Sequence, residues 1–283
     1  MYERRRVIIV LAITVLLLVS VVLVVAFPDS KPPHAPISIV GDASLSQADG
    51  DVRGDGSPQS PYVVEGWDIR APSNGSGIYV RGTNAHLVIR NVDIHSNGSA
   101  WFGVCLEYAR NVTLENVRMT GSWNGIRMNH CLNVGIHDCD ISSNLYGGIE
   151  ISRSENISVT ESRAGDTHLH NQWVSISSVC NISGNEFRPG DEKWRACDNH
   201  VGIEQCANIT FSANVMNDCD LQVWNCTGCS LSQNEFSGTC VRLVEIFGGA
   251  FVKNEMMHNS YLEMWNCVGM TVDRDYPSGP PGP

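Results

Sequence analysis

Acidic residues at short spacing are the first feature of this sequence that suggests chemistry. An inverting glycosidase needs two carboxyl groups roughly 6.5–9.5 Å apart, one as general acid and one as the base that activates water. Carboxylates on neighbouring strands could meet that requirement. The candidates are Asp138, Asp140, Glu150 and Glu161, together with Asp218 and Asp220. The alternative is that these acids are solvated charges on an acidic surface, so the pattern alone leaves catalysis open.

Two histidines in one short stretch suggest metal binding. His168 and His170 stand two residues apart, so a strand would point both imidazoles to the same side. Asp166 is close enough in sequence to join them. Imidazole suits copper and carboxylate oxygens suit calcium, so either ion is compatible with the chain, although none is required. Surface histidines that bind nothing are the simpler interpretation, because four ligands cannot be assembled from the spacing.

An insertion provides candidate ligand-binding residues. Residues 188–195 read Arg-Pro-Gly-Asp-Glu-Lys-Trp-Arg and lengthen one repeat of the chain. Loops that leave a regular scaffold commonly carry binding sites. The candidates there are Trp194 and Arg195, with Trp173 and Asp166 from the preceding repeat. Indole rings could stack on sugars, and rings that point inward would only fill the core.

These residues are positioned by a short unit that recurs along the chain. Apolar residues stand at offsets 0, 2 and 7 in blocks that begin at Leu87, Val112, Val134 and Ile157. A strand of the type Gly-Ile-x-Ile follows each of the first three blocks. Alternation over a few residues indicates very short strands, and self-similarity at 20 to 50 residues indicates a solenoid. The sequence therefore predicts an all-β fold, a right-handed parallel β-helix of about ten coils over residues 62–272.

The N-terminal residues predict a membrane anchor. Residues 1–6 form a basic tip with three arginines, and residues 7–27 are apolar except for Thr14 and Ser20. About 20 apolar residues span a hydrocarbon core of roughly 30 Å, and the preceding arginines place the N-terminus inside. We expect a single-pass protein of the cell membrane with its β-helix outside. A cleaved signal peptide is the rival interpretation.

Three further segments flank the repeats. Residues 28–36 are rich in proline and predict a stiff linker. Residues 37–61 are expected to cap the first coil, because the open end of a solenoid needs a cover. Residues 273–283 form a tail rich in proline and glycine. This tail cannot extend a sheet, and the sequence shows no dedicated C-terminal cap.

Charge and cysteine content narrow the partners and the compartment. The net charge of -11 disfavours nucleic acid, and we expect none as a partner. The 11 cysteines favour an oxidising compartment. Cys206 and Cys226 occupy equivalent positions in consecutive coils, and Cys219 and Cys240 nearly do. Stacked Cα atoms about 4.8 Å apart fit a disulfide, so two bridges are predicted, with buried reduced thiols as the alternative.

Asn-x-Ser/Thr sequons provide candidate glycosylation sites for an exported chain. They begin at Asn74, Asn97, Asn111, Asn156, Asn181, Asn208 and Asn225. Several of these asparagines, and Asn133, stand one residue before a coil start, where stacked amides can hydrogen-bond a bend. We expect such a ladder inside the bend, with glycans mainly at Asn74 and Asn97.

The repeats resemble a known family. Residues 54–69 resemble the opening coil of archaeal right-handed β-helix surface proteins, and the later Asn-x-x-Leu/Ile-x-Asn units resemble their repeats. These proteins are related to NosD-type periplasmic proteins and to the carbohydrate-binding and sugar-hydrolysis group of pectin-lyase-like folds. The resemblance covers about residues 37–272. It implies the fold, and it leaves the activity open because lyases, hydrolases, epimerases and non-catalytic proteins share this repeat.

Known catalytic motifs of that fold are missing from the sequence. The Asn-Thr-Asp, Asp-Asp, Gly-His-Gly and Arg-Ile-Lys set of polygalacturonases is absent, as is the Asp-Pro-His-Asp of mannuronan epimerases. We therefore expect an anchored extracellular protein that binds a polysaccharide or a surface glycoprotein without catalysis. A polysaccharide lyase, hydrolase or epimerase is the alternative. A NosD-like accessory protein that handles copper is the second alternative.

Overall fold

The computed structural model describes residues 31–45, 52–165, 170–175, 177–188, 200–274 and 276–277. Residues 33–283 form one compact unit and residues 1–32 another, of which only two residues are described. The predicted anchor at residues 7–27 lies outside the described residues. Within the described part of the chain, no helix is long and apolar enough to cross a membrane.

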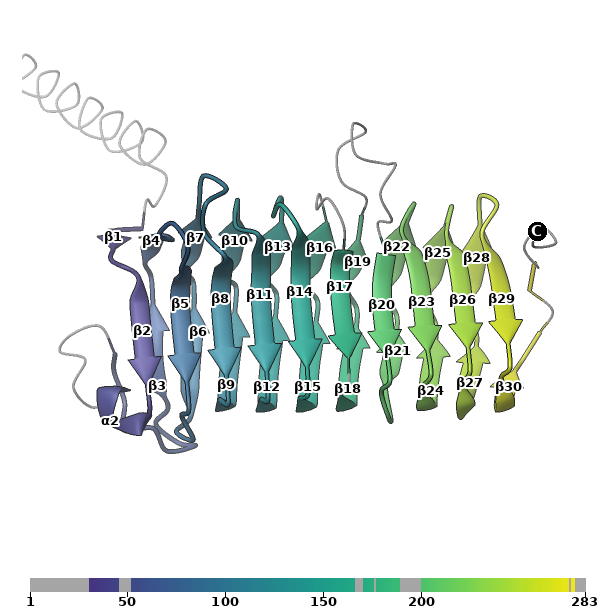
Figure 1. Ribbon diagram of the computed structural model, residues 1–283, viewed down its shortest axis with the longest axis horizontal. Helices are drawn as coiled ribbons and strands as arrows, with labels where there is room; N and C mark the ends of the chain where they lie inside the picture. The colour runs from purple at the N-terminus through teal and green to yellow at the C-terminus, as the bar shows by residue number, and fades with distance from the viewer. Residues whose placement is uncertain are drawn as a thin grey trace, which may run out of the picture. The chain divides into compact units, whose positions relative to one another are not determined.

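Three parallel sheets of ten strands each make up the compact unit (Figure 1). Sheet A contains β1 (Pro33–His34), β4 (Asp68–Arg70), β7 (Asp93–His95), β10 (Arg118–Thr120), β13 (Asp140–Ser142), β16 (Arg163–Gly165), β19 (Glu186–Phe187), β22 (Val215–Asn217), β25 (Glu235–Ser237) and β28 (Glu255–Met257). Sheet B contains β2 (Ile37–Val40), β5 (Ser76–Arg81), β8 (Phe102–Glu107), β11 (Asn124–Asn129), β14 (Gly147–Ser152), β17 (His170–Ser175), β20 (His200–Glu204), β23 (Asp220–Trp224), β26 (Cys240–Val244) and β29 (Tyr261–Trp265). Sheet C contains β3 (Tyr62–Glu65), β6 (Leu87–Arg90), β9 (Arg110–Glu115), β12 (Leu132–His137), β15 (Glu155–Thr160), β18 (Ser178–Ser183), β21 (Thr210–Ser212), β24 (Thr227–Ser232), β27 (Phe247–Val252) and β30 (Val268–Val272). The chain visits the three sheets in turn, so the predicted parallel β-helix is confirmed.

The repeated apolar offsets are the inward positions of two sheets. Offset 0 and offset 2 place residues such as Val112 and Leu114 on the inner face of sheet C, where both are fully buried. Offset 7 places residues such as Met119 on the inner face of sheet A. Corresponding residues of successive coils are in register, as Val112 is with Val134. Stacked apolar rows therefore form the core, because each short strand buries one face.

Polar residues with a positive φ make the bends between sheets. Asn91, Asn116, Asp138 and Glu161 each follow a strand of sheet C, with φ between 49° and 54°. Asparagine and aspartate enter this left-handed region at lower cost than other residues with a Cβ atom. Each bend lets the next residue point inward and turns the chain onto sheet A.

Asparagines also form an outer ladder, at the start of the strands of sheet C. Asn156 Nδ2 donates to Asn133 Oδ1 at 2.8 Å, and Asn133 Nδ2 donates to Asn111 Oδ1 at 3.1 Å. All three residues have a positive φ and both hydrogen bonds are exposed. The predicted ladder thus exists, but our prediction that it lies inside the bend is wrong.

A second, buried asparagine ladder lies between sheets C and A and was not predicted. Its members point into the core directly after the bend residue of four later coils. They are Asn185, Asn214, Asn234 and Asn254, all at most 2% exposed. The backbone N–H of each of the first three donates a hydrogen bond to the side-chain amide oxygen of the next asparagine. The amide groups thereby satisfy buried backbone donors and acceptors that a tight bend leaves unpaired.

Both ends of the described solenoid are covered. At the first coils, the short helix α2 (Asp42–Leu45) buries Leu45, and Asp42 accepts hydrogen bonds from the Thr83 hydroxyl and the Asn84 N–H. These bonds, that from Thr83 first, lower the pKa of Asp42. At the last coil, the Tyr276 ring packs edge-on against Phe251. The tail therefore serves as a cap, although the sequence showed none.

The cysteines described by the structure are all free thiols. Cys206 and Cys226 stack as predicted, with the Cys206 N–H 3.4 Å from the Cys226 Sγ. The predicted stacking of Cys219 on Cys240 is wrong. Leu221 pairs with Val241, so Cys240 instead lies opposite Asp220 and donates its N–H to that carboxylate at 2.8 Å. The two cysteines differ by one position in register, because they stand 21 residues apart whereas their coils are 20 residues apart throughout.

Candidate functional site

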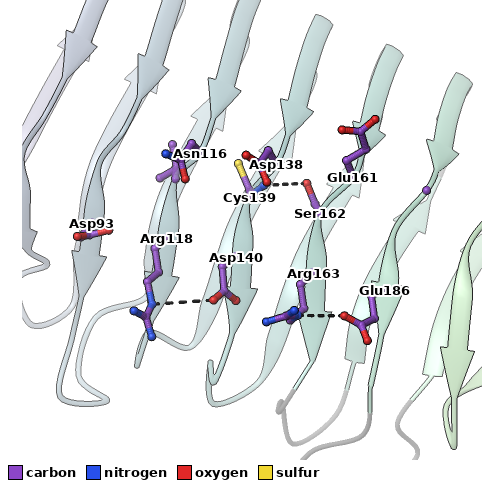
Figure 2. Close-up of a pocket in the computed structure, with 12 residues that line it drawn as sticks. Asp93, Asn116, Arg118, Asp138, Cys139, Asp140, Glu161, Ser162, Arg163 and Glu186 are labelled. Carbon is purple, nitrogen blue, oxygen red and sulfur yellow. Dashed lines mark hydrogen bonds and ion pairs between the residues drawn. The ribbon is translucent and has the colours of Figure 1, made fainter.

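Two hollows on the outside of the β-helix contain acidic residues. The first, which we call the bend hollow, lies where sheet C turns into sheet A and has a volume of about 510 Å³ (Figure 2). It brings together three of the predicted catalytic candidates, Asp138, Asp140 and Glu161. These acids come from two neighbouring coils and line the same hollow.

Charges in the bend hollow are explained by pairing between strands. Asp93, Arg118, Asp140, Arg163 and Glu186 occupy one register position on five consecutive strands of sheet A, so their charges alternate. Figure 2 shows these side chains in a row. Arg163 Nε lies 3.1 Å from Glu186 Oε2, and Arg118 Nε lies 3.9 Å from Asp140 Oδ2. Opposite charges on facing positions stabilise a sheet, so this row needs no ligand.

The remaining acids of the bend hollow are exposed. The Glu161 side chain is 70% exposed and lies 3.6 Å from His137 Nε2. Asp138 is an exposed bend residue with a φ of 51°. Solvated carboxylates at a bend match the alternative interpretation that the sequence left open.

The second hollow lies on the outer face of sheet B and has a volume of about 520 Å³. We call it the sheet-B hollow. Residues from β11, β14, β20 and β23 and from the turn before β14 line it. They are Asn124, Tyr146, Gly147, Ile149, Glu150, His200, Glu204, Gln222 and Trp224. This mixture of aromatic, amide and carboxylate groups is the usual lining of a ligand site.

Glycines explain why the outer face of sheet B is hollow at this point. The row that contains Glu150 continues through Trp173 and Gly202 to Gln222. Gly202 contributes no side chain to that row, and Gly147 contributes none to the neighbouring row. The surface is therefore lower here than where every coil presents a side chain.

Glu150 is held at one side of the hollow by a hydrogen bond and an ion pair. Asn124 Nδ2 donates to Glu150 Oε2 at 3.0 Å, and Arg127 Nε lies 3.6 Å from Glu150 Oε1. Arg127 is itself stacked over the Phe102 ring, with its guanidinium carbon 5.3 Å from the ring centre. These contacts hold the carboxylate in place, and Arg127 is itself held by the Phe102 ring.

Asn124 presents an unpaired polar atom to the hollow. Its side chain is 9% exposed, and within the described residues its Oδ1 is buried without a hydrogen-bond donor. Buried polar atoms without a partner are uncommon and each asks for an explanation. Solvent does not reach this oxygen in the structure, so a ligand hydroxyl in the hollow would supply the missing donor once the Asn124 side chain turns to expose it.

Glu204 lies across the hollow from Glu150. Glu150 stands on β14 and Glu204 on β20, with β17 between them. Glu204 is in register with Ser152, so the backbone positions of the two glutamates are roughly 12 Å apart. Among the described residues, the Glu204 carboxylate has no hydrogen bond or ion pair. Trp224 lies opposite Glu204 on β23 and is 57% exposed. Its ring is free to carry a ligand at the rim.

The opposite rim of the hollow carries a stacked pair of aromatic rings. Tyr146 and Trp123 stack with their ring centres 6.3 Å apart, and both are exposed. His200, which is 7% exposed, lies between this rim and Glu204. Aromatic faces at both rims and polar groups on the floor fit a sugar chain, since sugars present both C–H faces and hydroxyls.

The other predicted site residues have different outcomes. Asp220 pairs in register with His200, and Asp218 is a bend residue with a φ of 48°, so neither lines the sheet-B hollow. His170 and Trp173 lie on β17, where only the backbone is described. Asp166, His168, Trp194 and Arg195 lie outside the described residues. Among the residues that are described, no three histidines, cysteines or acids are placed to hold a metal ion.

Glu204, His200 and Tyr146 were missed as site residues. A signal for Glu204 exists in the sequence, because the tripeptide Gly-Ile-Glu occurs at residues 148–150 and again at residues 202–204. The repeat could have marked both glutamates. It does not show that they face one hollow, since that depends on the strand between them.

Comparisons with known proteins agree with this architecture. Residues 52–170 match the family described as right handed beta helix region. The chain has a right-handed parallel β-helix fold. This β-helix is similar to an alginate lyase from Paenibacillus sp. str. FPU-7, with 13% identity, 84% of this chain and 99% of that chain covered, and a TM-score of 0.51.

Two other structures are more distant from this β-helix. The A-module of a mannuronan C-5 epimerase from Azotobacter vinelandii has 12% identity, 75% and 64% coverage and a TM-score of 0.46. A surface adhesin of Streptococcus pneumoniae has 11% identity, 84% and 71% coverage and a TM-score of 0.38. A search of curated proteins found no match. At these identities the likeness shows the fold alone, so the archaeal and NosD-like relationships stay predictions.

Proposed function

We propose that this β-helix is a glycoside hydrolase that cleaves a polysaccharide lying across the outer face of sheet B. The observation that carries the proposal is the sheet-B hollow, which Glu150 and Glu204 both line together with exposed aromatic rings. This proposal replaces our prediction from the sequence that the protein binds a polysaccharide or glycoprotein without catalysis. The acids of the bend hollow are not part of it, because their partners are other side chains of sheet A or water.

Each glutamate has a role that its contacts support. Glu150 accepts a hydrogen bond from Asn124 and is paired with Arg127, so it stays ionised, which suits the carboxylate that activates water as a general base. Glu204 has no partner among the described residues and stands beside Trp224, which suits the acid that protonates the leaving oxygen. The backbone positions of the two glutamates are two strands and two residues apart, roughly 12 Å. This spacing leaves room between the side chains for the water that inverting enzymes need, whereas the two carboxyl groups of retaining enzymes lie only roughly 5 Å apart. We therefore expect inversion at the anomeric carbon.

The test measures chain cleavage by the purified full-length protein on a panel of polysaccharides. New reducing ends report hydrolysis, and the anomeric form of the first product reports inversion. Glu150→Gln and Glu204→Gln should each lower the rate about 100- to 10,000-fold. Glu263→Gln is the matched control, since Glu263 lies on the same face, outside the hollow, paired with Arg242. No cleavage by the wild-type chain, or full activity in both hollow variants, would refute the hydrolase.

Binding without cleavage is a second candidate, and one specific observation favours it. Trp224 and Trp265 are both more than half exposed, and Trp224 lies beside Glu204 at the rim of the hollow. Exposed indole rings suit stacking on sugars. Retention on an immobilised polysaccharide without shortening of the chain, lost in Trp224→Ala, would support binding alone.

We further propose that the β-helix acts outside the cell, held by residues 7–27 with the N-terminus inside. The proposal rests on the apolar run and on the arginines before it. A protease added to intact cells should degrade the β-helix, and the protein should stay in the membrane fraction after alkaline washing. Release by washing would indicate a cleaved signal peptide instead.

A further inference from the structure

We infer that the polysaccharide taken by the sheet-B hollow is uncharged. This inference rests on the proposed function and names its substrate class. Many polysaccharides carry a carboxylate on every sugar, and others carry only hydroxyls. The charges and hydrogen-bonding groups of the hollow distinguish between the two.

Among its lining residues, the hollow has no arginine or lysine to receive a carboxylate. Its two acids are Glu150 and Glu204. A run of uronate sugars would bring further negative charge close to these groups. Like charges that close repel one another, because salt at physiological strength screens only beyond about 8 Å.

The nearest arginines on the same face are already paired. Arg127 faces Glu150, with 3.6 Å between Nε and Oε1. Arg242 pairs with Glu263, with 2.9 Å between Nε and Oε2. Each guanidinium is thereby neutralised by a carboxylate of the chain. A uronate could bind either one only by competing with that carboxylate.

The unpaired oxygen of Asn124 points to the same conclusion. It is an acceptor and therefore needs a donor. A sugar hydroxyl can donate, whereas an ionised carboxylate can only accept. The side-chain amide of Gln222, on the other side of Gly202, both donates and accepts, which again matches hydroxyls. The floor of the hollow is thus complementary to a neutral sugar.

This inference also decides the reaction class. A lyase removes a proton from the carbon next to a uronate carboxyl group, and the glycosidic oxygen then leaves by elimination. A neutral sugar has no such carboxyl group, so its glycosidic bond is cleaved by adding water across it. One proton goes to the leaving oxygen and the hydroxyl group of water goes to the anomeric carbon.

The test compares polyuronates with their own carboxyl-reduced forms, which have the same backbone without the charge. The full-length protein is passed over each immobilised polymer at low and at high salt, alongside other neutral polysaccharides. We expect at least about tenfold stronger retention on a neutral polymer than on any polyuronate at low salt, with a smaller difference at high salt. Equal or stronger retention on a polyuronate overturns the inference and leaves the proposed polysaccharide binding intact. Retention on no polymer overturns the proposed function itself.

A variant with an added positive charge tests whether the preference for neutral polymers arises in the hollow. Gln222→Lys adds a positive charge beside Gly202 and should raise retention on a polyuronate about threefold or more. Gln233→Lys makes the same change of net charge at an exposed bend between sheets C and A, away from the outer face of sheet B. It should leave retention unchanged. An equal rise in both variants would mean that only the net charge of the chain matters, and it would overturn the inference.

Discussion

Replacing Asn234 with alanine tests whether buried amides hold the bends of this solenoid together. The side chain of Asn234 makes four hydrogen bonds in the core. Its Nδ2 donates to the Phe211 carbonyl at 3.0 Å and to Asn254 Oδ1 at 2.9 Å. Its Oδ1 accepts from the backbone N–H of Asn214 at 3.0 Å and from the Nδ2 of the same residue at 3.1 Å. Alanine makes none of these bonds.

The expected loss follows from the groups left behind. The Phe211 carbonyl and the Asn214 N–H would stay buried without partners, and each costs about 1–3 kcal/mol. Asn254 and Asn214 would also each lose a bond to the side chain. We expect the free energy of unfolding to fall by about 4 kcal/mol. The backbone adds nothing, because the left-handed residue of this bend is Gln233 and not Asn234.

Guanidinium denaturation of the wild-type and variant chains measures this loss from the midpoints. Asn133→Gly is the matched control, because Asn133 belongs to the exposed ladder and has a φ of 57°, which glycine adopts without strain. Its unfolding free energy should change by less than about 1 kcal/mol. Equal losses in the two variants, or a loss below about 1 kcal/mol for Asn234→Ala, would refute the idea that burial of the ladder stabilises the fold.

Two further predictions concern thiols and the last coil. Burial raises the pKa of Cys105 and of Cys139 to about 12, above the ordinary value of 9. A raised thiol pKa stabilises the fold fully below pH 9, and this contribution is lost as the pH rises towards 12. Denaturation midpoints should therefore fall above pH 9, and by less in Cys139→Ala; equal falls would contradict the assignment. Tyr276→Ala removes the ring against Phe251 and the hydroxyl that accepts the Asn254 N–H, so amide exchange should speed up in β27 and β28. Unchanged exchange there would show that the tail is no cap.

The core could be predicted from the sequence because burial and chain period coincide. Offsets 0 and 2 of each block, as in Val134 and Ile136, are alternate residues of a strand, so they must point to one side. The same reasoning failed for the buried asparagines. Asn214 and Asn234 are polar, and polarity alone assigns a residue to the outside. Only the bend geometry, with a left-handed residue just before each one, explains why an amide lies in the core.

The other limit on prediction from the sequence was the register between coils of unequal length. The coil that contains the insertion at residues 188–195 is longer than its neighbours, so counting from a coil start misplaces residues that follow a turn. Glu204 was missed for this reason, since its relation to Glu150 depends on the register of β14, β17 and β20, which lie on both sides of the insertion. The mismatch of Cys219 and Cys240 has a simpler cause, because they stand 21 residues apart in coils that are 20 residues apart in register. Glu150 itself could be predicted as an outward carboxylate, because it lies within the Gly-Ile-x-Ile strand motif that repeats along the chain.

In a parallel β-helix, each outward position of a strand forms a row of side chains with the equivalent positions of the neighbouring coils. The rows differ in whether their charged and polar groups find partners within the row. The row from Asp93 to Glu186 in sheet A alternates in charge, so each arginine has a carboxylate on a neighbouring strand. The row through Glu150 in sheet B is interrupted at Gly202, and the amide oxygen of Asn124 beside it has no donor. A sheet that completes its own pairs offers little to a ligand, whereas an interrupted row leaves both space and unpaired groups. For this reason the sheet-B hollow, and not the more acidic bend hollow, is where a polysaccharide would gain contacts that the protein does not already make.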